Sequence, residues 1–199
     1  VIWQRSFHDV FVNSATLRSW NLGDEASFGA ALAAAGASPA DSSFDRGLFS
    51  ETGLPVALAK LRPDLLSPAL IQSGMAALQR LYLTHGITTS SDMGTGIFAD
   101  FDTEAGLIKT AFERPGNPSR IMLMLLAGAV GEGIDPGARI DEISRRYAGP
   151  HVRVDRRVKL LADGAFFAQN MRMNAPGYSD GHQGKWITPP DGRAREMRP

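Results

Sequence analysis

The apolar and charged positions from Arg156 to Gly164 predict a β-strand whose two faces have different surroundings. One face carries Val158, Leu160 and Ala162, and the other carries Lys159, Leu161 and Asp163. If the first face packs on helices, the second face places a lysine and a carboxylate in a confined space. The two charged residues would lie about 13 Å apart along the strand, so each side chain needs another partner.

Three segments before this strand show apolar residues at helical spacing. They start at Ser67-Pro68, at about Thr103 and at Asp135-Pro136, and end at Gly86, Arg114 and Gly149-Pro150. Strands are predicted between them at Ile87 to Ser91, at Ser119 to Ala127 and from His151 onward. The order of strand, helix, strand, helix and strand predicts right-handed βαβ units, an α/β fold and a parallel sheet.

The first third of the chain has a different pattern. Val1 to Trp3 is predicted to finish a strand, and Asn13 or Ser14 to cap a short helix that runs through Trp20. Residues 21–66 are rich in Ala, Gly, Ser and Pro, so we expect a loop-rich excursion with one short helix rather than a second domain.

Composition narrows the classes of function. The chain has 199 residues, of which 43% are hydrophobic and 21% charged, and this is ordinary for a globular domain. The formal net charge is +0, so we expect neither a nucleic acid nor a membrane surface as partner. No apolar run approaches the roughly 20 residues that cross a bilayer. Cysteine is absent, which leaves the compartment open, with the cytoplasm favoured.

Lys159 is the residue with the most specific chemistry. A desolvated lysine loses its proton more readily, and the free amine can take up carbon dioxide to become an N-carboxylate, an oxygen ligand able to bridge two metal ions. Arginine cannot react in this way because its guanidinium stays protonated. The alternative is a structural lysine that pairs with a carboxylate elsewhere.

Four stretches together resemble the metal-dependent amidohydrolase superfamily, in its amidohydrolase-3 branch with the N-substituted formamide deformylase-like hydrolases. They are RSFHDVFVNSATL, GLFSETG, HGITTSSDMG, and VKLLADGAFF with the following NAPGYSDG. The resemblance implies a TIM-like (β/α)8 barrel of which this chain contains about half. It also implies that Lys159 is the carboxylated bridge of a centre holding one or two divalent metal ions, with zinc favoured.

The histidines depart from that family pattern. Family members carry an HxH pair after their first barrel strand, two further histidines and a late aspartate. The only histidines here are His8, His85, His151 and His182, and no two have the spacing of a metal-binding pair. We therefore expect the chain to be the central part of a longer hydrolase, 1–199, whose remaining ligands lie outside both ends and without which it is inactive.

Several residues are second candidates for contact with substrate. His8, Asp92, Phe166 and Tyr178 are the expected substrate-binding residues, and Glu51 also matches a family position. Each has a simpler interpretation: a loop histidine bonded to backbone for His8, a cap on the following loop for Asp92, and a surface loop with its own hydrogen bonds for the residues after Gly164.

The sequence thus leads to three hypotheses for function. The first is a metal-dependent hydrolase of carbon–nitrogen bonds in a small amide, formamide or cyclic amide. The second is a noncatalytic α/β scaffold or binding module derived from such an enzyme, and the third keeps the metal centre for isomerisation or ester hydrolysis. Half a barrel would leave sheet edges and apolar helix faces uncovered, so we also expect a homo-oligomer or self-association.

Overall fold

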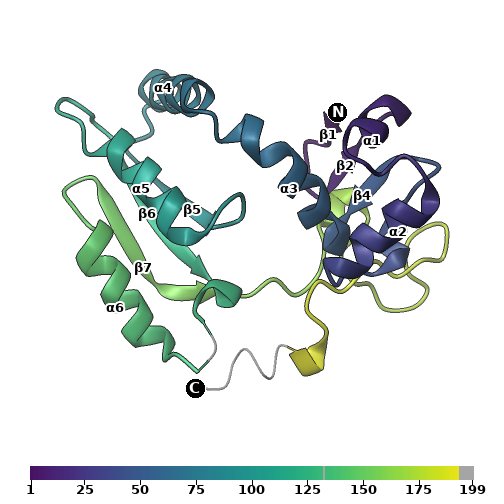
Figure 1. Cartoon of the computed structure of the whole chain (residues 1–199). Coiled ribbons are helices and arrows are strands. Elements are labelled where there is room, and N and C mark those ends of the chain that lie inside the picture. The colour runs from purple at the N-terminus through teal and green to yellow at the C-terminus, as the bar shows by residue number, and fades with distance from the viewer. Residues whose placement is uncertain (132, 193–199) are drawn as a thin grey trace. The chain divides into compact units, whose positions relative to one another are not determined.

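The computed structural model describes residues 1–131 and 133–192, which form a mixed α/β structure of two compact units (Figure 1). Unit 1 combines Val1–Leu61 with the chain from Leu161 to residue 192. Unit 2 consists of Arg62–Leu160. Each unit has its own hydrophobic core.

Unit 2 contains a parallel sheet with strand order β5-β6-β7, as the strand–helix alternation predicts. The strands are β5 (Thr89–Thr95), β6 (Arg120–Leu126) and β7 (Val152–Lys159). The helices are α4 (Pro68–Thr84), α5 (Phe101–Phe112) and α6 (Pro136–Tyr147), and a 3-10 turn, η3 (Ala127–Ala129), follows β6. The parallel arrangement is confirmed. A closed barrel is not, since the described part of this sheet has three strands.

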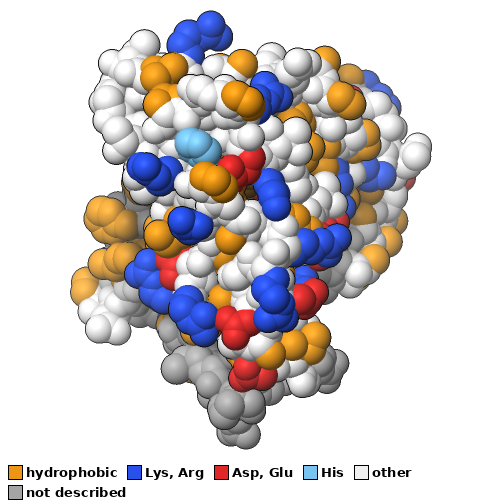
Figure 2. All heavy atoms as spheres, turned by 90° about the vertical axis from the view of Figure 1, so that its left-hand side faces the viewer, with side chains coloured by type: hydrophobic (Ala, Val, Ile, Leu, Met, Phe, Trp, Pro, Cys, Tyr) orange, Lys and Arg blue, Asp and Glu red, His pale blue; other side chains and the backbone are white. Residues whose placement is uncertain are grey.

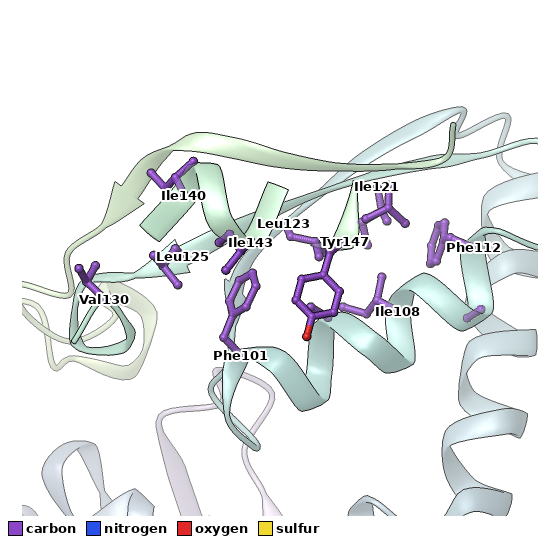
Figure 3. Packing of buried hydrophobic residues seen from close by; sticks show 13 residues of the cluster. Phe101, Ile108, Phe112, Ile121, Leu123, Leu125, Val130, Ile140, Ile143 and Tyr147 are labelled. Atoms are coloured by element: carbon purple, nitrogen blue, oxygen red, sulfur yellow. The ribbon is translucent and has the colours of Figure 1, made fainter. Parts of the chain in front are cut away.

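The core of unit 2 lies between the sheet and the helices α5 and α6. Leu123, Met124 and Leu125 are consecutive buried residues of the central strand β6, so both of its faces are covered there, which explains the nearly continuous apolar run in that segment. Figure 3 shows side chains of α5, α6 and β6 meeting in one cluster. The helical spacing of apolar residues places Ile140, Ile143 and Tyr147 on one face of α6, and all three are buried.

Capping residues set the helix starts. Asp135 accepts a hydrogen bond from the Ala138 amide at 2.7 Å and begins α6, as predicted. Asp100 accepts a hydrogen bond from the Thr103 amide at 2.9 Å and begins α5. This helix therefore starts at Phe101, two residues before the expected start at Thr103. In α4, Met75, Leu78 and Tyr82 pack against the core.

One face of α4 remains apolar and open. Leu70 is 48% exposed and Leu81 49% exposed, although both follow the helical spacing of the segment. No helix in residues 1–131 and 133–192 combines the length and hydrophobicity needed to span a bilayer.

Charges of both signs are mixed on the surface. Figure 2 shows Lys and Arg side chains interspersed with Asp and Glu on the face turned to the viewer. Unit 2 has ion pairs between neighbouring charges of opposite sign. The side-chain N···O distance from Asp102 is 3.3 Å to Arg139 and 3.0 Å to Arg146, and that from Asp141 to Arg156 is 2.8 Å.

Unit 1 is built on an antiparallel sheet with strand order β1-β2-β4-β3. The strands are β1 (Ile2–Trp3), β2 (Asp9–Phe11), β3 (Ser42–Ser43) and β4 (Leu48–Ser50). The helices are α1 (Ser14–Ser19), α2 (Glu25–Ala34) and α3 (Leu54–Leu65), with 3-10 turns η1 (Pro39–Asp41), η2 (Glu51–Gly53) and η4 (Phe166–Ala168). Asn13, one of the two predicted caps, begins α1.

The stretch 21–66 has more regular structure than a loop-rich excursion. Asp24 and Ser27 form a reciprocal capping box that starts α2, and the 10-residue α2 and 12-residue α3 occupy much of the stretch. Phe28 packs against the fully buried Phe49 with ring centroids 4.9 Å apart. The alanine-rich composition gave little sign that α2 is a regular helix with Phe28 in the core.

The strand through Lys159 is shorter than predicted. Lys159 is the last residue of β7 and lies opposite Leu126, the last residue of β6. Because β6 offers no ladder partner beyond that point, the chain leaves the sheet, and Asp163 does not share a strand face with Lys159. Asp163 instead forms an isolated bridge with Trp186 and accepts a hydrogen bond from the Arg172 amide at 2.9 Å.

Glu104 provides a test of how the loop after β5 is held. Its buried carboxylate accepts hydrogen bonds from the amides of Gly96 at 2.7 Å, Phe98 at 2.5 Å and Ala99 at 2.6 Å. Glu104→Ala removes the acceptor of all three groups, so we expect the free energy of unfolding of unit 2 to fall by about 2–4 kcal/mol in urea denaturation. Asp64→Ala, at an exposed carboxylate, is the control and should change it by less than about 0.5 kcal/mol. Equal effects of the two substitutions would contradict this role.

Candidate functional site

Lys159 lies at the carboxyl end of the parallel sheet in unit 2. It is half-buried at the end of β7. The residues described, 1–131 and 133–192, give its amine no hydrogen-bond or ion-pair partner. Open α/β sheets bind their ligands at this edge, so Lys159 has the location expected of a working side chain.

Asp92 is the second candidate on this sheet. It lies within β5 rather than after it, next to a register irregularity between Asp92 and Thr95. Its carboxylate accepts hydrogen bonds from the Gly94 amide at 3.1 Å and from the Thr95 hydroxyl at 2.9 Å. These local bonds match the simpler interpretation, in which Asp92 stabilises the backbone after it. Because β6 lies between β5 and β7, at least about 10 Å separates the strands that carry Asp92 and Lys159.

The described residues do not build a metal centre by themselves. Within 1–131 and 133–192, no group of three or more His, Cys, Asp or Glu side chains is placed to hold a metal ion. Lys159 would be a single ligand, whereas structural and catalytic zinc sites take three or four from the protein. The donor set present does not fit a metal ion without further ligands.

Unit 1 contains a second candidate site, a hydrogen-bonded pair formed by His8 and Glu51. His8 Nδ1 lies 3.1 Å from Glu51 Oε1 and 3.0 Å from Oε2. The Glu51 side chain is only 1% exposed, and its backbone adopts a φ of +42°, in the left-handed region. A non-glycine residue in that region carries backbone strain, which accumulates at functional sites.

Neighbouring residues of unit 1 surround this pair closely. Lys185 Nζ lies 3.4 Å from the Ser50 hydroxyl and 3.5 Å from Asp41 Oδ1. A Cβ atom on Gly164 would lie 2.5 Å from Glu51 Oε1, so the lack of a side chain at Gly164 allows the backbone to approach the carboxylate. Two family-like stretches far apart in the sequence therefore meet at Glu51.

The electrostatics of the pair have an identifiable cause. Burial raises the pKa of Glu51, while the hydrogen bond from His8 and the positive charge of Lys185 lower the pKa in part. When the His8 Nδ1 proton faces the carboxylate, the tautomer is fixed and Nε2 becomes the basic nitrogen of the neutral ring. A histidine oriented in this way can accept or donate a proton.

The loop after Gly164 is held mainly by its own contacts. The Tyr178 hydroxyl donates to the Met171 carbonyl at 3.0 Å, and its ring stacks on His182 with centroids 4.6 Å apart. His182 bonds to Asp180 through Nδ1 and lies 2.7 Å from the Gln169 carbonyl through Nε2. The interpretation as a self-bonded surface loop thus describes Tyr178.

Phe166 and His85 complete the description of the candidate residues and histidines. Phe166 is 61% exposed in η4, so its ring is available to a ligand. His85 Nδ1 lies 2.9 Å from the Leu81 carbonyl at the end of α4, so this side chain satisfies one of the last helix carbonyls.

Sequence reasoning treated His8 and Glu51 separately and missed their pairing. Their separation of 43 residues follows no local period, so only the resemblance of both segments to one family connected them. Comparisons of the chain with protein-family models, with curated proteins and with solved structures found no match.

Glu51→Gln tests whether the buried charge costs stability. Because the folded-state pKa of Glu51 is raised, the neutral carboxyl is the better-tolerated form in the fold, and its stabilising contribution is lost as the pH rises from the ordinary value of 4.5 through the folded-state pKa. We expect Glu51→Gln to be more stable than the wild type by about 1 kcal/mol at pH 7, with no difference below pH 4.5.

Thermal or urea unfolding across this pH range measures the effect, and Glu25→Gln, at an exposed position in α2, is the matched control. A variant less stable than the wild type at pH 7 would show that the ion pair with His8 outweighs the burial of the charge.

Proposed function

We propose that this chain belongs to a hydrolase that cleaves carbon–nitrogen bonds in small amides, formamides or cyclic amides. The single observation that supports the proposal is the position of Lys159. It ends the last strand of a parallel sheet, at the edge where α/β enzymes place reacting groups, and its amine has no partner among the described residues. A lysine used only for structure would be expected to pair with a carboxylate.

The choice of carbon–nitrogen bonds rests on the resemblance of the four stretches described above. These stretches lie in both units, since His8, Glu51 and Gly164 belong to unit 1 and Lys159 to unit 2. The contact of Gly164 with Glu51 brings two of the stretches together within unit 1. Such an arrangement is what a shared ancestry of the segments would produce.

The metal ion remains part of the proposal on the basis of the resemblance alone. Divalent metal, with zinc favoured, would require ligands in addition to those that the described residues offer. Lys159 as an N-carboxylate would be the contribution of this chain to that centre.

A substitution at Lys159 tests the function. We expect Lys159→Ala to lower amide hydrolysis by about 100-fold or more, because a group at the reacting centre is removed. The assay uses the protein as its natural gene encodes it, purified in bicarbonate with zinc and tested on a panel of amides, formamides and cyclic amides. Native mass spectrometry should show about 44 Da added to the wild type, the mass of one carbon dioxide, and none added to the variant.

Lys60→Ala is the matched control because Lys60 is an exposed lysine in α3. It should retain both activity and bound metal. If Lys159→Ala keeps full activity, Lys159 has no catalytic role; if the wild type binds no metal and cleaves no amide, the scaffold hypothesis replaces the hydrolase.

A further inference from the structure

Unit 1 has a hollow on its surface that the proposed function does not use. Its volume is about 410 Å³, and Gln4, Arg5, Ser6 and Phe167 line it. Gln4, Arg5 and Ser6 belong to the loop between β1 and β2, while Phe167 belongs to η4. All four of these residues lie within unit 1. A volume of this size falls in the lower range of small-molecule sites.

The loop between β1 and β2 is tightly bonded. The Gln4 amide donates to the Asp9 carbonyl at 2.9 Å, and the Phe7 amide to the Gln4 carbonyl at 2.9 Å. The buried Ser6 hydroxyl bonds to the Gln4 side chain and accepts from the His8 amide at 3.1 Å. Phe7 has a φ of +64°, so the turn is held in a conformation that side chains rarely adopt. The polar wall of the hollow is therefore preorganised.

Arg5 supplies a positive charge that unit 1 does not neutralise. Arg5 is exposed, lines the hollow, and has no ion pair or hydrogen bond with residues 1–131 or 133–192. Arg172, another arginine of unit 1, bonds instead to the Gly184 carbonyl at 3.1 Å. A free guanidinium beside amide and hydroxyl groups is suited to a carboxylate, which it can bind through two parallel hydrogen bonds.

Phe167 contributes an aromatic side chain to the lining of the hollow. Its side chain is 74% exposed, and the next ring along the chain, Phe166, is 61% exposed. Exposed aromatic rings at a concave site gain free energy when a ligand covers them. The hollow thus combines one cation, two neutral polar side chains and one aromatic ring.

We propose that this hollow binds a small monocarboxylate with an aromatic body, whose carboxylate pairs with Arg5 and whose ring packs on Phe167. One guanidinium balances one negative charge, so the site favours a monocarboxylate over a phosphate monoester, whose greater charge calls for several cations. The site does not depend on the hydrolase activity or on Lys159, because its residues lie in unit 1.

Phenylacetate and its neutral analogue phenylacetamide are the probes that separate charge from shape. For ligands of about ten non-hydrogen atoms we expect a Kd for phenylacetate on the order of 1 mM and a Kd about tenfold weaker for phenylacetamide. Amide chemical shifts of the labelled protein follow each titration, and they should move most in residues 4–8 and 166–168.

Arg5→Gln should weaken phenylacetate about tenfold and leave phenylacetamide unchanged, so that the two ligands bind equally. Phe167→Ala should weaken both ligands by the same factor. The matched controls are Arg46→Gln, at another exposed arginine of unit 1, and Phe166→Ala, at the neighbouring exposed ring that does not line the hollow. Both controls should bind like the wild type.

The ratio of the two affinities makes the test independent of any loss of folding. The proposal is overturned if Arg5→Gln keeps the preference for phenylacetate, if neither probe binds, or if the shifts map elsewhere. Tighter binding of phenylphosphonate than of phenylacetate would overturn the monocarboxylate assignment. Lys159→Ala should bind both probes like the wild type, so failure of the hydrolase proposal and failure of this one give different results.

Discussion

Burial of β6 on both faces is the constraint on which unit 2 depends. Leu123 and Leu125 on one face are fully buried, and Met124 on the other face is buried as well, in a strand that has a partner strand on each side. The ladder between β6 and β7 then sets where β7 ends, because Lys159 is opposite the last residue of β6. The position of the Lys159 amine at the carboxyl edge of the sheet therefore follows from where the buried strand β6 ends.

Unit 1 depends on a different balance, because it buries a carboxylate. Desolvation of Glu51 opposes ionisation, and His8 and Lys185 offset that effect in part. The positive φ of Glu51 costs conformational energy, and the close approach of Gly164 leaves no room for a side chain at that position. Natural proteins commonly retain such unfavourable arrangements where a side chain has a function, which makes the His8–Glu51 pair a candidate of equal interest to Lys159.

The local elements could be predicted because their signals are local. Asp135-Pro136 begins α6, Asn13 caps α1, and Ile140, Ile143 and Tyr147 face the core, all from patterns within a few residues. The prediction that Asp163 shares a strand with Lys159 was wrong, since the apolar residues Leu160 to Ala162 continue the sequence signal of a strand after the hydrogen-bonding partner has ended. The helix α2 was underestimated because an alanine-rich segment has little periodic signal of its own.

The sequence by itself determined the parallel α/β character of unit 2 and the starts of α4 and α6, and it pointed to Lys159 as the candidate for unusual chemistry. Tertiary structure alone decided that Glu51 meets His8 across 43 residues, that Gly164 approaches them, and that Arg5 and Phe167 face one hollow. The physical reason is that periodicity and capping arise from bonds between near neighbours. Burial, charge pairing and cavity shape arise from segments that meet only after the chain has folded.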